Sequence, residues 1–326
     1  MTAIGGSKIF SRITWINAAV GLGMLAYHYT ISPLPMNFQL FYFLLMTAAT
    51  GIPHGALDHI IAKTNTEKHK QEFSIQHFLG KYVLVILFYT ACWIIFPSIS
   101  LLIFLIISAW HFGEIDLSEA SDHVSWNISR LLWGSFVLLT ILLTHQQDTE
   151  MVIMRITKSS PQVTAIWEAV KQHGLIIVAI TGLITLASII IANKNKKLTI
   201  SLPIFLNLVI ILSLCALLPL LPAFALYFGG WHAIRSFELI FRFLQKEKQS
   251  EAERPITMWK HSLPMTFLAT IGFIFLAYIW NAAGLKTDPL PALFIFLSII
   301  TLPHLDVMDQ LIKKNNASLP STEMPR

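Results

Sequence analysis

Charged residues are scarce in this chain. Asp, Glu, Lys and Arg together make up 13% of its 326 residues, whereas 55% are hydrophobic and the mean hydropathy is +0.63. Soluble globular domains carry about 25% charged residues. The composition therefore excludes an ordinary soluble domain and predicts a membrane protein.

Cysteine is nearly absent as well. Cys92 and Cys215 are the two cysteines of the chain, and both fall within apolar runs. Buried cysteines of this kind behave as small hydrophobic residues, so the sequence excludes a disulfide framework.

Repeated apolar runs of about 18 to 22 residues are long enough to cross a bilayer as α-helices. We expect an all-α polytopic bundle of about ten transmembrane helices, forming a single domain over residues 1–312. The remaining polar segment, residues 313–326, is expected to be a disordered cytoplasmic tail. Pro97 lies between the third and fourth helices and predicts a tight hairpin or a kinked pair. The expected helices cover residues 9–30, 38–62, 79–96, 98–116, 128–144, 174–192, 199–219, 223–243, 262–283 and 290–312.

The basic residues lie in short loops between the apolar runs. The net charge is +5, but loop lysines and arginines are typical of the cytoplasmic side of a membrane protein, so no nucleic-acid partner is expected. With ten crossings, these basic loops all lie on the same side of the membrane as the N-terminus. The positive-inside rule makes that side the cytoplasm. We therefore expect a multi-pass protein of the inner (plasma) membrane with its N-terminus in the cytoplasm.

Four polar segments interrupt the apolar runs, and each contains a histidine. They are Gly51-Ile52-Pro53-His54-Gly55-Ala56-Leu57-Asp58-His59, Trp110-His111-Phe112-Gly113, Trp231-His232 and Pro303-His304. Ionisable groups within a membrane span are expensive and usually functional. In the expected topology, His54, His111, His232 and His304 lie at similar depth on helices that run in the same direction, so we expect them to converge on one metal ion.

Neutral imidazole binds iron, copper, zinc and nickel, and a neighbouring carboxylate often holds its other ring nitrogen. Acidic residues that could do so are Asp58, Glu114, Asp116, Glu238, Asp306 and Asp309. Aromatic residues of the fourth and eighth helices could line a tunnel for a long apolar molecule; they are Trp110, Phe112, Phe224, Tyr227, Phe228 and Trp231.

The same residues bear on other kinds of protein. The chain has no His-x-x-x-His or His-x-x-His-His cluster of the kind found in membrane di-iron desaturases, and no His-Glu-x-x-His of zinc proteases. Haem ligation by pairs of histidines would usually place haems near both membrane faces. The four histidines of this chain are expected at similar depth instead, which disfavours haem. A transporter or channel with a histidine-lined polar pathway is the alternative that the residues leave open.

At these four motifs the sequence resembles the Brp/Blh family of membrane β-carotene 15,15′-dioxygenases, from about Leu40 to Leu311. The resemblance implies Fe(II) held by histidines, with dioxygen cleaving the central double bond of β-carotene into two retinals in the lipid bilayer. It makes His54, His111 and His232 iron ligands. The family pattern has a second histidine one turn after Trp-His, where this chain has Ser236, so His304 or water would complete the sphere.

Overall fold

The computed structural model describes residues 2–195, 202–247, 254–282 and 289–317. Within these ranges the chain forms helices and turns with no strand, so the all-α prediction is confirmed. The elements are α1 (Thr2–Thr30), α2 (Met36–Met46), η1 (Thr47–Gly51), α3 (Ile52–Gly55), α4 (Asp58–Lys68), α5 (Ile75–Ile95), α6 (Pro97–Asp116), α7 (Val124–Thr144), α8 (Gln146–Ile156), α9 (Pro161–Gln172), α10 (Gly174–Asn195), α11 (Leu202–Leu217), α12 (Leu220–Tyr227), η2 (Phe228–His232), α13 (Ala233–Glu247), α14 (Pro255–Ala282) and α15 (Pro289–Ala317).

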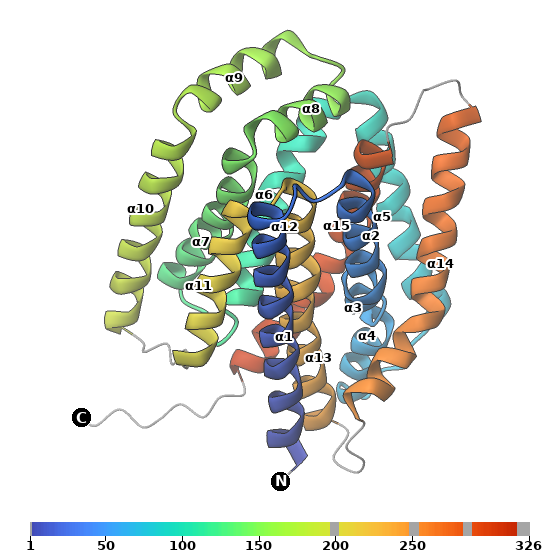
Figure 1. The fold of residues 1–326 in the computed structure, drawn as a ribbon. Coiled ribbons are helices and arrows are strands. Elements are labelled where there is room, and N and C mark those ends of the chain that lie inside the picture. Colours follow the sequence, from blue (N-terminus) through green and yellow to red (C-terminus); the bar gives the residue numbers. More distant parts are fainter. Residues whose placement is uncertain (1, 196–201, 248–253, 283–288, 318–326) are drawn as a thin grey trace.

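Most of the helices run along a common axis and form a bundle (Figure 1). Among the described residues, seven helical segments are long and apolar enough to cross a membrane, fewer than the ten expected. The other three expected segments are helical but depart from a plain span. The described part of α11 has 16 residues and follows directly on residues outside the described ranges. The chain through α12 and α13 contains the π-helical turn η2 and carries Arg235, Glu238 and Arg242, and α14 begins with a polar stretch that includes Lys260.

The expected single helix over residues 38–62 is also divided. After α2 the backbone widens into the π-helical turn η1, continues as the short α3, and turns at Ala56 and Leu57 before α4 begins. Run length identifies an apolar helix but is blind to a local change in hydrogen-bond register, which is why this break was missed.

The break at Pro97 forms a tight hairpin. Phe96 leaves the helical conformation, with φ −130° and ψ 62°, and Pro97 then opens α6. Proline is well placed there because the first turn of a helix needs no backbone N–H donor. The Tyr89 hydroxyl donates to the Ser100 carbonyl at 3.0 Å, which joins the last turns of α5 to the first turn of α6.

Helices α6 and α7 approach each other at two glycines. A Cβ on Gly113 would lie 1.7 Å from the carbonyl oxygen of Arg130, and one on Gly134 would lie 1.7 Å from that of Ala109. Small residues allow this backbone contact between membrane helices. The contact fixes the half of α6 that carries His111.

The segment between α7 and α10 forms the pair α8 and α9 at the end of the bundle away from the start of α1 (Figure 1). α9 is amphipathic. Trp167 is buried, whereas Lys171 is partly exposed and pairs with Glu150 and Glu168 at 2.9 and 2.8 Å.

Candidate metal centre

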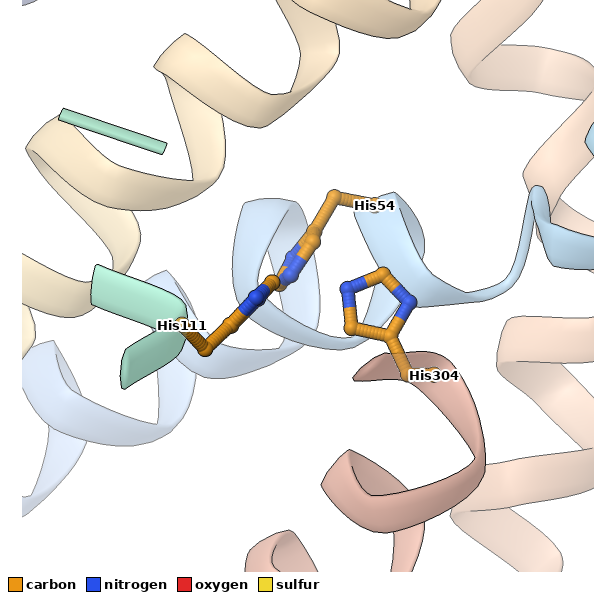
Figure 2. Close-up of side chains that lie close together, drawn as sticks. All are labelled: His54, His111 and His304. Atoms are coloured by element: carbon orange, nitrogen blue, oxygen red, sulfur yellow. The ribbon is translucent and has the colours of Figure 1, made fainter. Parts of the chain in front are cut away.

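The four histidines singled out in the sequence lie together in the interior of the bundle. The ligand nitrogens of His54, His111 and His304 are within 4.8 Å of one another, and Figure 2 shows these rings converging from α3, α6 and α15. The ring centroid of His232 lies 4.8 Å from that of His111 and 5.6 Å from that of His54. The centroid distance between His54 and His304 is 4.9 Å, and between His111 and His304 it is 5.1 Å.

The convergence follows from chain direction. α2 with α3, α6, α12 with η2, and α15 all run toward the end of the bundle where α1 begins (Figure 1). Each carries its histidine in the second half of that passage. The rings therefore reach one depth from four separate helical segments.

Two of the histidines follow π-helical turns. η1 comes just before His54, and η2 ends on His232. A π turn inserts one extra residue into the helix and redirects the side chains after it, and such turns are frequent at functional sites. In the sequence, the two π-helical turns are marked only by their glycines. These are Gly51 in η1, and Gly229 and Gly230 in η2.

The two π turns pack against each other. The Thr50 hydroxyl donates to the Gly229 carbonyl at 2.9 Å and to the Met46 carbonyl at 2.8 Å, which satisfies backbone oxygens near both turns. A Cβ on Gly51 would lie 2.6 Å from the Phe228 ring. These contacts hold His54 and His232 at a fixed separation.

The histidine nitrogens are buried and largely without protein partners. The exposed fractions of His54, His111, His232 and His304 are 4%, 2%, 0% and 4%. Within the described part of the chain, neither ring nitrogen of His111 or His232 has a hydrogen-bond partner, nor does Nε2 of His304. Leaving a buried polar atom unsatisfied costs about 1–3 kcal/mol.

A bound metal ion would account for one unpaired nitrogen on each ring that it contacts. An ion bound at about 2 Å from each imidazole nitrogen brings its ligand atoms within about 4 Å of one another, close to the spacing of the His54, His111 and His304 nitrogens. The His232 ring lies beside this group of three but is not part of it. The four rings also supply neutral donors of one chemical kind. The residues therefore fit a single bound transition metal.

Asp58 holds one of the rings in place. Its Oδ1 lies 2.8 Å from His304 Nδ1, and its Oδ2 accepts a hydrogen bond from the Tyr82 hydroxyl at 3.0 Å. With Nδ1 turned to a carboxylate, His304 presents Nε2 to the centre, the arrangement usual for metal-binding histidines. His54 has a weaker version, in which Nδ1 lies 3.3 Å from the Thr50 carbonyl.

Other acidic residues proposed for this role have different partners. Asp116 accepts hydrogen bonds from Trp133, Tyr227 and Trp231, each at 2.8 Å. Glu238 pairs with Arg235 and Arg242, and Asp309 pairs with Lys313. Spacing alone could not distinguish Asp58 from them, and nothing in the sequence singled out Tyr82.

Ser236 occupies the place where the family pattern has a histidine. It is fully buried, and its hydroxyl donates to the His232 carbonyl at 3.0 Å, one turn back along the same helix. Its oxygen is thus engaged with the backbone, while the His304 ring, from α15, stands beside His54 and His111.

A cavity of about 630 Å³ opens beside the histidines, within the usual range for small-molecule sites. Its walls are mostly apolar. Of the aromatic residues expected to line a tunnel, Phe112, Phe224 and Phe228 do so. Tyr227 and Trp231 instead turn their polar atoms to Asp116, so the expectation was wrong for them. Trp110 is not among the lining residues.

These features define a class: a membrane helix bundle with an all-histidine metal-type centre at the wall of an apolar cavity. The model of the β-carotene 15,15′-dioxygenase family matches residues 45–312. The chain therefore belongs to this family and is a carotenoid-cleaving dioxygenase.

One relative is a protein of uncultured marine bacterium 66A03 described as β-carotene 15,15′-dioxygenase. It is 24% identical over 282 residues, which cover 85% of this chain and 95% of the relative. No solved structure matches the chain.

Proposed function

We propose that the protein binds one Fe(II) through His54, His111, His232 and His304 and cleaves β-carotene with dioxygen into two molecules of retinal. The observation that carries this proposal is the meeting of four buried, mostly unpaired imidazoles at the wall of one apolar cavity. The relative described as β-carotene 15,15′-dioxygenase supports the choice of substrate.

The donor set is compatible with iron, one of the metals that neutral imidazole binds. Four neutral imidazoles leave a divalent ion with its full positive charge and do not require a carboxylate to be buried as a ligand. Bound Fe(II) supplies the redox chemistry that lets dioxygen react with an alkene. The reaction balances without another reductant, because each of the two aldehydes receives one oxygen atom.

The residues of the chain bind and orient the polyene. Phe228 stacks nearly parallel to His232, with centroids 6.1 Å apart and an interplanar angle of 13°. It also makes an edge contact with the His54 ring, with centroids 6.1 Å apart, and both rings line the cavity. Phe224 stacks on Phe228 at 5.4 Å and extends this aromatic wall. A flat conjugated chain lying on the wall would present its double bonds to the centre.

The same walls exclude water. The cavity is lined mainly by Leu, Ile, Val and Phe side chains, which provide few hydrogen-bond partners for solvent. A dry site protects reactive oxygen species from side reactions with water. The scheme needs no general acid or base from the protein, and Asp58 is occupied by His304 and Tyr82.

We also propose the cellular arrangement expected from the sequence. The ends of α4, α10 and α13, near which basic residues gather, lie at the same end of the bundle as the start of α1 (Figure 1). The positive-inside rule then puts this end, with the N-terminus, in the cytoplasm of a cell bounded by the inner (plasma) membrane. Residues 1–312 act as one domain; Lys313 to Ala317 continue α15, and residues 318–326 lie outside the described structure.

The test is iron content and product formation in the same preparations. Wild-type protein from a β-carotene-accumulating host should contain about one iron per chain and release retinal. His54→Ala, His111→Ala, His232→Ala and His304→Ala should each lose iron and activity. His77→Ala, which removes an exposed imidazole at the start of α5, should lose neither.

A transporter or channel with a histidine-lined pathway makes the opposite prediction. It would carry no stoichiometric metal and would leave the carotenoid intact in cells that contain the folded protein. That result would refute the proposed function.

A further inference from the structure

The cavity beside the histidines reaches the outer surface of the bundle. Val83 and Leu87 of α5 line the cavity, yet their exposed fractions are 48% and 61%. Leu268 and Phe275 of α14 also line it and are 58% and 62% exposed. Side chains that belong to both a cavity wall and the outer surface mark the edge of an opening.

The packing of the two helices leaves room for this opening. α5 packs mainly on α6 and α15, whereas α14 packs mainly on α3 and α15. The two helices thus flank α15 without being each other's main partners, and α14 stands at the edge of the bundle (Figure 1). Both are apolar at this level, so the opening faces hydrocarbon.

Gly272 lies on α14, at the middle of the edge that this helix forms along the opening. It falls between Leu268 and Phe275, one turn from each, and is exposed while lining the cavity. A Cβ built on it meets no atom within 4 Å. The missing side chain therefore leaves empty space in the opening itself. No close contact with a neighbouring helix requires a glycine at this position.

The inner part of the cavity accommodates only part of a long molecule. From His111 to Leu101 on α6, and from His304 to Phe294 on α15, the lining extends over ten residues, or about 15 Å of helix. Buried residues of α8 and α12, Ile156 and Leu220, also line this region. A substrate cut at its middle must extend in two directions from the cleaved bond, so its second half needs another path.

We propose that the gap between α5 and α14 is a lateral opening to the bilayer, through which the carotenoid enters and in which its outer half rests. Gly272 is the residue that keeps this opening wide. The proposal rests on the proposed function for the identity of the occupant. A carotenoid dissolved in hydrocarbon reaches the metal centre by this route without passing through water.

The experiment compares Gly272→Phe with Gly272→Ala and Gly23→Phe. Gly23 is a matched control because it is an exposed glycine of a membrane helix, α1, and its Cβ would also meet no atom within 4 Å. Each protein is placed in phosphatidylcholine vesicles that contain β-carotene. Uptake is followed by quenching of tryptophan fluorescence by the polyene, and iron content and the initial rate of cleavage are measured in parallel.

Gly272→Phe should lower the carotenoid uptake rate and kcat/KM at least tenfold. Its iron content should equal that of Gly23→Phe. Gly272→Ala and Gly23→Phe should stay within about twofold of wild type. The proposal is overturned if Gly272→Phe takes up carotenoid as fast as Gly23→Phe, or if the wild type takes up none. Uptake that depends on Gly272 but is followed by no cleavage would support the opening and refute the proposed function.

Discussion

The hydrogen bond between Asp58 and His304 gives the sharpest test of how the protein would hold the proposed iron. Both side chains are buried, with exposed fractions of 2% for Asp58 and 4% for His304, and Oδ1 lies 2.8 Å from Nδ1. Asp58→Ala removes this bond and leaves the His304 ring free to turn. The ring would then spend only part of its time with Nε2 directed at the centre.

The expected effect is large enough to measure. Loss of a carboxylate behind a ligand histidine typically lowers metal affinity 10- to 100-fold, which corresponds to about 1.4 to 2.7 kcal/mol. Asp58→Asn should cost less, because its amide oxygen still accepts a hydrogen bond from Nδ1. Tyr82→Phe removes only the 3.0 Å contact to the other carboxylate oxygen and should change iron affinity less than Asp58→Ala.

The assay is iron binding in competition with a chelator, measured on folded protein. Asp309→Ala is the control, because this aspartate lies on α15 five residues after His304 but pairs with Lys313, which is exposed. It should bind iron as wild type does. Wild-type iron affinity in Asp58→Ala would show that the carboxylate does not orient a ligand and would refute the assignment of His304.

Three further outcomes are expected. Ser108→Phe places a ring in the cavity one turn before His111 and should lower retinal formation at least tenfold while the iron content stays unchanged. The control Ser108→Ala should remain active. Loss of iron together with activity in Ser108→Phe would contradict this prediction. Gly113→Ala should destabilise the fold by about 1–3 kcal/mol or more, seen as a lower Tm, because its Cβ would lie 1.7 Å from the Arg130 carbonyl oxygen. Gly80→Ala lies in open space within α5 and should not lower Tm, because alanine favours the helix over glycine. Removing iron with a chelator should lower Tm reversibly, since a ligand at 100 times its Kd stabilises the folded state by about 2.7 kcal/mol; an unchanged Tm would argue against a metal bound by four helical segments.

The amino-acid sequence by itself determined the class of the protein. Long apolar runs and scarce charge specify membrane helices because both are properties of contiguous residues, and the break at Pro97 is local too. The four histidine motifs were visible for the same reason. Their common depth followed from counting passages and loop charges, so the meeting of the rings was predictable in outline.

Only the tertiary structure decided how the site is built. The widening of η1 and η2 depends on contacts between helices, such as Thr50 with Gly229, that are 179 residues apart in the chain. The choice of Asp58 as the partner of His304 depends on the crossing of α4 and α15, and sequence spacing ranked six acidic residues alike. The cavity and its opening between α5 and α14 are spaces left by packing, and packing is set by side chains meeting across the bundle rather than by their order along it.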